Sequence, residues 1–260
     1  MIQALKSALA FIFWTVIGLR AKGLDRDNLN SSVVLDPWSL PHFPKVAVLG
    51  RSESAMALES YDDFDLTVLV NYSDSDLLSA SFRKRVLSSQ RIILLHNSME
   101  RSISLRMAKQ MNLSAVAWLG FHPSTGTNRR RSTWRLNQLG RKVQYLPQHC
   151  AVSAASQGRS AGIGGVALAS LISDEVHLFG IDFYRADYIP KSEGKSVALR
   201  TGLDQQESRG PSAEKAFRSV ASLRPGVSFV VHSYLDIGIK ASNITSIMEN
   251  RQPARIEEDE

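Results

Sequence analysis

Three side chains that could bind an anionic ligand follow one strongly apolar stretch of the sequence. Residues 176–181 are mostly apolar, and Asp182, Tyr184 and Tyr188 come soon after them. A carboxylate can accept hydrogen bonds from ribose hydroxyls, and phenolic hydroxyls can donate to a phosphate. The three side chains together could hold a nucleotide, whereas either tyrosine alone could be a half-buried loop residue.

Small and polar residues follow the earlier apolar stretches. A glycine after the first stretch would let the backbone approach a phosphate, and asparagine side chains could bind a base, a ribose or a phosphate. A tight turn or helix capping explains the same residue types. The candidate positions are Gly50, Arg51, Ser52, Asn71, Asn97 and Ser98.

A further group of candidates opens the helix that the sequence predicts over 160–172. Small residues at a helix start leave main-chain amides accessible to an anion, and Arg159 adds a positive charge. Close packing of the helix on a sheet would also require small residues, and the two interpretations are compatible. The candidates here are Arg159, Ser160, Ala161 and Gly162.

The elements that must position these residues alternate along the chain. Short apolar runs predict strands, and amphipathic stretches predict helices between them. The pattern predicts an α/β fold with an open, doubly wound, mostly parallel sheet of about seven strands, whose ligand binds at the strands' carboxyl ends. The predicted strands are 46–49, 66–70, 92–95, 115–119, 143–146, 176–181 and 227–231, and the clearest helices are 98–111, 160–172 and 211–223.

The chain divides into four predicted parts. Residues 1–24 form an apolar segment, which could be a helix in the membrane interface or a first helix packed on the domain. Its apolar run, 7–19, would cover roughly 20 Å as a helix, less than the ~30 Å hydrocarbon core. Residues 25–45 form a linker, 46–245 the α/β domain and 246–260 an acidic tail.

The charge is distributed unevenly. The formal net charge is +6, yet residues 101–173 contain ten basic residues and no Asp or Glu. This basic segment could face nucleic acid, an anionic membrane or a phosphorylated small molecule, or it could be a solvated surface. The composition excludes a disordered chain, and one cysteine, Cys150, excludes an intrachain disulfide. A cytoplasmic protein is therefore expected, with a peripheral position at the inner face of the membrane as the alternative.

The segment from Ser160 to Tyr184 resembles the signature of the bacterial lipooligosaccharide sialyltransferases. That signature is a Thr-Ser-Gly helix start, one helix, and a strand that ends Gly-Ile-Asp-Phe-Tyr, which this chain matches at every position of 180–184. The likeness covers about residues 45–235. It implies a nucleotide-binding Rossmann-like α/β domain with a lid, here about 185–210.

The resemblance also implies an activity and roles for individual residues. The family transfers an acidic sugar from a CMP-activated donor to a glycan or glycolipid hydroxyl, with inversion and without a metal or other cofactor. By resemblance, Asn71, Asn97 and Ser160 contact the nucleotide or the sugar of the donor. Asp182 and Phe183, at the end of the matched strand, are further candidates for donor binding. Tyr184 and Tyr188 correspond to the pair that donates hydrogen bonds to the departing phosphate.

The sequence departs from the family pattern at the general base. The family histidine lies just before the helix that is predicted to start at Pro211, but residues 205–211 contain no histidine. His232, at the end of the last predicted strand, is the candidate replacement. A hydrogen-bonded residue at a strand end is the alternative for His232. The glycine turn also differs, since Arg51 stands where the family has Asn.

Two other functions remain open from the sequence. One is a nucleotide-dependent transferase on a related fold without sialyl specificity. The other is a nonenzymatic protein that binds anions or nucleic acid through Arg129, Arg130 and Arg131. Nucleic-acid binding is the less favoured function, because Trp134 is the only aromatic residue close to these arginines in the sequence that could stack on a base.

Overall fold

Within the part of the chain that the structure describes, eight parallel strands form one central sheet. The computed structural model describes residues 41–57, 63–72, 74–77, 79–96, 105–118, 143–145, 160–185 and 203–250. Every pair of neighbouring strands in these ranges is parallel. The strands are β1 (Phe43–Leu49), β2 (Leu66–Val70), β3 (Ile92–His96), β4 (Leu113–Trp118), β5 (Val143–Tyr145), β6 (Ser173–Phe179), β7 (Ser228–Ser233) and β8 (Ile244–Met248). The predicted α/β fold with a parallel sheet is confirmed.

Among the described residues, the sheet contains one strand that the sequence did not predict. The first seven strands coincide with the apolar runs, whereas β8 was missed. Only Ile244 of its five residues is buried, because β8 lies at the edge of the sheet beside β7. An edge strand with exposed side chains lacks the continuous apolar run that marks a buried parallel strand.

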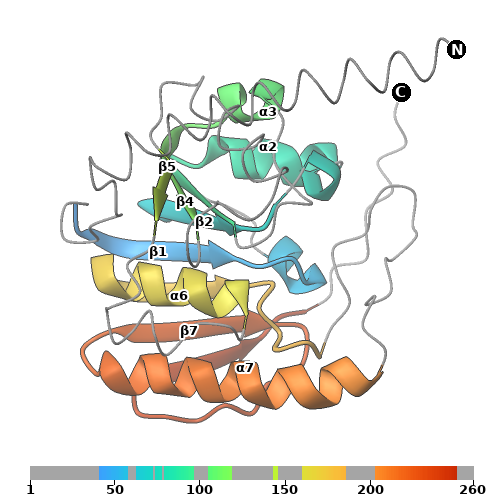
Figure 1. The fold of residues 1–260 in the computed structure, drawn as a ribbon, viewed down its shortest axis with the longest axis vertical. Coiled ribbons are helices and arrows are strands. Elements are labelled where there is room, and N and C mark those ends of the chain that lie inside the picture. The colour runs from blue at the N-terminus through green and yellow to red at the C-terminus, as the bar shows by residue number, and fades with distance from the viewer. Residues whose placement is uncertain are drawn as a thin grey trace, which may run out of the picture.

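Described helices cover both faces of the sheet (Figure 1). Helices α6 (Ala161–Ile172) and α7 (Leu203–Leu223) pack on the face that carries Val46 and Val48. Helices α2 (Ala80–Ser88) and α3 (Leu105–Gln110) pack on the opposite face, which carries Ala47 and Leu49. Alternate residues of β1 therefore enter two separate cores, as a doubly wound sheet requires.

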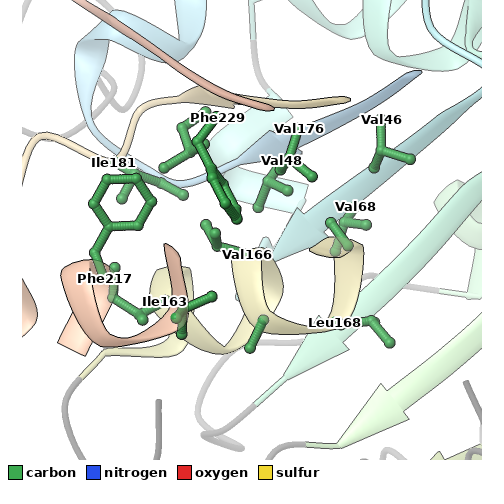
Figure 2. Close-up of a cluster of buried hydrophobic side chains, with 14 of the residues drawn as sticks. Val46, Val48, Val68, Ile163, Val166, Leu168, Val176, Ile181, Phe217 and Phe229 are labelled. Carbon is green, nitrogen blue, oxygen red and sulfur yellow. The ribbon is translucent and has the colours of Figure 1, made fainter. Parts of the chain in front are cut away.

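Helix α6 is apolar on all sides and all of its residues are buried. Figure 2 shows Ile163 and Val166 of α6 in one cluster with β-strand residues and with Phe217 of α7. Burying a side chain of this size contributes roughly 1.5–3 kcal/mol, so the sheet and α7 together hold α6 firmly in place. The helix start, which carries the candidate Ser160, is fixed as a consequence.

The strand order places a topological switch point between β1 and β6. The order is β5-β4-β3-β2-β1-β6-β7-β8, so the chain first builds outward from β1 and then returns to its other side. In open α/β sheets the ligand binds beyond the carboxyl ends of the strands at such a point. A ligand is therefore expected beside the segments that follow Leu49 and Phe179.

Helix α7 begins earlier than the sequence predicted. It starts at Leu203, and Pro211 lies inside the helix rather than at its start. A proline is well tolerated in the first helical turn and removes one hydrogen bond from a helix interior. The eight residues before Pro211 extend the helix despite that loss, so part of the predicted lid, from 203 to 210, belongs to α7.

The described strands also cross two predicted boundaries. Strand β1 starts at Phe43, inside the predicted linker, and β8 continues to Met248, inside the predicted acidic tail. The predicted N-terminal segment 1–24 and most of the predicted lid, 186–202, lie outside the described residues. Within the described ranges, no helix has the length and apolar character needed to cross a membrane.

Candidate functional site

The backbones that follow β1 and β6 approach each other closely at the switch point. The Gly50 amide donates to the Phe179 carbonyl over 2.7 Å, and the Ser52 amide donates to the Gly180 carbonyl over 3.1 Å. A Cβ on Gly50 would lie 2.1 Å from the Gly180 oxygen, and Gly180 itself has a φ of +66°. Both positions therefore require glycine. The Gly50 amide, predicted to approach a phosphate, is engaged by β6 instead.

Asp182 lies at the centre of this junction. Its side chain is 2% exposed, and its Oδ2 atom accepts hydrogen bonds from the hydroxyls of Ser52 and Ser54. The Ser54 hydroxyl also accepts from the Gly180 amide over 3.1 Å. The loop after β1 thus fixes the orientation of a carboxylate that follows β6.

The other carboxylate oxygen of Asp182 has no partner among the described residues. Oδ1 is buried, yet no hydrogen bond reaches it there. A buried polar atom without a partner costs about 1–3 kcal/mol, so such an atom beside a strand-end junction is a candidate for binding a ligand. A ligand with an O–H or N–H donor would satisfy this oxygen.

Left-handed backbone conformations are concentrated beside Asp182. Among the described non-glycine residues, only Asn71, Phe183 and Tyr184 have positive φ, at 57°, 50° and 64°. Asn71 follows β2, and the other two follow β6, so all three lie at the carboxyl edge of the sheet. Such backbone strain is unfavourable for residues with a Cβ and is common at functional sites.

The turn after β6 separates the roles of its two aromatic residues. The Phe183 ring is buried and packs against Phe217 of α7, with ring centroids 5.6 Å apart. Tyr184 is only half-buried, at the rim of the same core. Phe183, predicted to contact the donor, therefore directs its side chain into the core. Tyr184 remains available at the surface.

The start of α6 lies against the same junction. A Cβ on Gly162 would meet the Ile181 side chain at 3.4 Å, so the first turn of α6 packs beside the residue before Asp182. Ser160 is the N-cap residue, but its hydroxyl makes no capping hydrogen bond. Ala161 and Gly162 are buried at this end. The sequence-predicted helix start and Asp182 are thus brought together.

Arg51 is engaged by an acidic residue of the protein. Its guanidinium Nη2 lies 2.7 Å from Oδ1 of Asp76, whose side chain is 1% exposed. Asp76 belongs to the short helix η3 (Asp74–Leu77) that follows β2. The predicted contact of Arg51 with the donor competes with this ion pair. The pair instead ties the loop after β1 to the loop after β2.

His232, the candidate general base, lies in a chain of four titratable side chains. Its Nε2 is 2.8 Å from Nδ1 of His177, and its Nδ1 is 2.6 Å from Oε1 of Glu249. The second ring nitrogen of His177 bonds to Glu175. Both nitrogens of His232 are therefore occupied by protein groups. This geometry favours the alternative interpretation of His232 as a hydrogen-bonded residue at a strand end.

Burial lowers the pKa of both histidines. Desolvation disfavours the imidazolium form of His177 and His232, and the hydrogen bonds with Glu175 and Glu249 oppose that effect only in part. The hydrogen bond from His177 in turn lowers the pKa of Glu175. The Phe179 ring stacks on His232 with centroids 4.1 Å apart, which contributes to the burial.

The remaining predicted site residues are not placed by the structure. Tyr188, Asn97, Ser98 and Arg159 lie outside the described residues, as do the arginines at 129–131. Ser54 joins the site although it was not a predicted ligand-binding residue. The sequence feature that could have identified Ser54 is its position two residues after Ser52, in the same loop that begins at Gly50. Within the described part of the chain, no three His, Cys, Asp or Glu side chains could hold a metal ion.

Comparison with known proteins gives matches among solved structures. No protein-family model matches the sequence, and no curated protein matches it. The sialyltransferase CstII from Campylobacter jejuni, in complex with CMP, is 11% identical over 74% of this chain and 81% of that chain, with a TM-score of 0.48. The monofunctional α-2,3-sialyltransferase Cst-I from the same organism is 12% identical over 72% and 74%, with a TM-score of 0.44. These structural neighbours are sialyltransferases, the kind of enzyme that the motif ending at Tyr184 resembles.

Proposed function

We propose that the protein is a metal-independent glycosyltransferase that moves an acidic sugar from a CMP-activated donor to a glycan hydroxyl with inversion. The observation that carries this proposal is the buried, half-satisfied carboxylate of Asp182, next to a left-handed turn that presents Tyr184. The match of residues 180–184 to the sialyltransferase signature supports it.

Asp182 would bind the nucleoside part of the donor. Its Oδ2 is already held by two serine hydroxyls, so Oδ1 is left to accept a hydrogen bond from a ribose hydroxyl. Because the serines fix the carboxylate before the ligand arrives, little side-chain freedom is lost on binding.

Tyr184 would act on the leaving group. In the transfer the acceptor oxygen forms a bond to the anomeric carbon, and the bond from that carbon to the phosphate oxygen breaks. The bonding electron pair leaves with the phosphate of CMP, and the acceptor proton passes to a base. A phenolic O–H aimed at the phosphate stabilises this developing charge. The start of α6, which carries a partial positive charge, packs beside Ile181, the residue before Asp182.

Donor turnover tests the proposal directly. The full chain would be incubated in EDTA with CMP-sialic acid, with and without glycan acceptors, and CMP release would be measured. We expect release without added metal, and a large fall in turnover for Tyr184→Phe with donor affinity nearly kept. Tyr234→Phe is the matched control, since Tyr234 is also half-buried but lies in the loop after β7. Turnover only with another nucleotide sugar plus magnesium would contradict the proposal.

A further inference from the structure

The left-handed turn that carries Tyr184 is built against one face of α7. A Cβ on Gly210 would lie 2.8 Å from the Phe183 carbonyl oxygen, so the helix touches the turn directly at that point. Four residues later, Glu214 Oε2 accepts from Arg185 Nη2 over 2.9 Å. Phe217 packs on Phe183. Residues four and seven positions apart lie on the same face of a helix. Gly210, Glu214 and Phe217 therefore contact the turn from one face of α7.

Arg185 closes the turn and connects it to a third segment. Its main-chain amide donates to the Asp182 carbonyl over 2.9 Å. Its guanidinium donates to Glu214 and, through Nη1, to the carbonyl of Ile237 over 2.8 Å. The residue therefore joins the Asp182 backbone, α7 and the loop after β7. Strained backbone persists where its surroundings fix it this fully.

A second arginine makes similar contacts without touching the turn. Arg218 donates to Oε1 of Glu214 and to the carbonyl of Lys240. The side chains of Arg185 and Arg218 are both 43% exposed. Both arginines donate to the Glu214 carboxylate and to a carbonyl of the loop after β7, but only Arg185 belongs to the turn.

We infer that Arg185 and Glu214 are positioning residues, which hold the turn so that the Tyr184 hydroxyl meets the leaving phosphate. This inference rests on the proposed function. Neither side chain touches the nucleotide in this account; both act through the backbone of Phe183 and Tyr184. Misplacing a catalytic group by about 1 Å can cost about 100-fold in rate, so loosening the turn reduces turnover more than donor binding.

The matched arginine pair tests the inference. CMP release from CMP-sialic acid, with water or a glycan as acceptor, would be measured for Arg185→Ala and Arg218→Ala. We expect kcat to fall at least about tenfold for Arg185→Ala with donor KM changed less than about threefold, and both parameters to stay within about threefold for Arg218→Ala. Arg185→Lys, which keeps the charge but not the two-armed geometry, should lie between wild type and Arg185→Ala.

A glycine pair keeps the test decisive if Arg185→Ala does not fold. Gly210→Ala pushes a methyl group against the Phe183 carbonyl, whereas Gly226 has no neighbour within 4 Å of its Cβ position. Gly210→Ala should lower kcat, and Gly226→Ala should not. The inference would be overturned if kcat fell equally in Arg185→Ala and Arg218→Ala and also equally in Gly210→Ala and Gly226→Ala. It would also be overturned if kcat fell in none of these variants. No CMP release by the wild type would overturn the proposed function, and the inference with it.

Discussion

The Ser54 hydroxyl donates to Oδ2 of Asp182 over 2.6 Å and joins two segments that are 128 residues apart in the chain. The contact is buried and lies where the carboxyl ends of β1 and β6 meet. It orders the carboxylate on one side only, since Oδ1 has no partner among the described residues. The protein therefore holds the carboxylate through Oδ2 and leaves Oδ1 to accept a hydrogen bond from a ligand.

The Ser54–Asp182 contact should stabilise the fold as well as orient the carboxylate. Ser54→Ala removes a donor to a buried carboxylate and an acceptor for the Gly180 amide, so we expect a loss of about 1–3 kcal/mol in the free energy of unfolding. Urea denaturation measures it. Ser88→Ala, at an exposed helix position, is the control and should change the free energy by less than about 0.5 kcal/mol. Equal values for the two variants would contradict this role.

Gly50 should not tolerate a side chain. A Cβ there would lie 2.1 Å from the Gly180 carbonyl oxygen, so the two strand ends must separate in Gly50→Ala. We expect a loss of more than about 3 kcal/mol, as for overpacking of a core contact between backbones. Gly226→Ala gives the comparison, because its Cβ would meet no atom within 4 Å. A melting temperature for Gly50→Ala equal to that of Gly226→Ala would show that the junction is looser than described.

The ion pair of Arg51 and Asp76 should be structural rather than nucleotide-binding. Asp76 is buried, so Asp76→Ala breaks a buried ion pair by removing one of its two members and should cost about 3–5 kcal/mol. Replacing both residues, as in Arg51→Met with Asp76→Leu, should recover part of that loss. Affinity for CMP, measured by calorimetry on the double variant, should stay close to the wild-type value. A tenfold weaker affinity would instead assign Arg51 to the donor, as the sequence first predicted.

The two buried histidines should make the protein less stable in mild acid. Their pKa values are lowered below the usual 6.5 in the fold, mainly by burial, whereas the unfolded chain takes up protons near 6.5. Stability is thus fully present above 6.5 and falls as the pH drops below it, by up to about 1.4 kcal/mol per pH unit for each proton bound only on unfolding. Glu175, whose pKa is also lowered, adds to the loss at still lower pH.

Urea denaturation between about pH 7.5 and pH 5 would show the effect of the histidines. The variant with His177→Gln and His232→Gln should lose most of the slope of stability against pH in that range. Lys45, Glu175 and Glu249 also face this pair and are unchanged in the variant. A slope that is the same in wild type and double variant would contradict the assignment.

Much of the fold was predictable because a buried parallel strand has a simple sequence pattern. The first seven strands are apolar runs, and their alternation with helices gave the parallel sheet. Strand β8 was not predicted, because four of its five residues are exposed and it lacks an apolar run. The start of α7 was predicted too late in the chain, because the sequence does not distinguish a proline in the first turn of a helix from a proline inside it.

The junction of strand ends that carries the candidate site was predictable in its position and less so in its contacts. The strand order that puts Gly50 and Asp182 side by side follows from parallel alternation and one switch point. The partners of individual side chains do not follow from it. Sequence spacing gave no reason to pair His232 with Glu249, or Arg51 with Asp76, because those contacts depend on the register of distant segments.

The proposed binding of a cytidine nucleotide by Asp182 can be measured as the affinity of CMP for wild type and for Asp182→Asn. Asparagine keeps the shape and can still accept from the two serines, but its amide would put a donor where the ribose hydroxyl needs an acceptor. Calorimetry in EDTA should show CMP binding to the wild type and at least a tenfold loss, about 1.4 kcal/mol, in the variant. The melting temperature of the variant should stay close to that of the wild type, because a buried charge without a partner on one oxygen is exchanged for a buried neutral amide without a partner on its nitrogen. Equal CMP affinity in the two proteins, or no CMP binding by the wild type, would contradict the account.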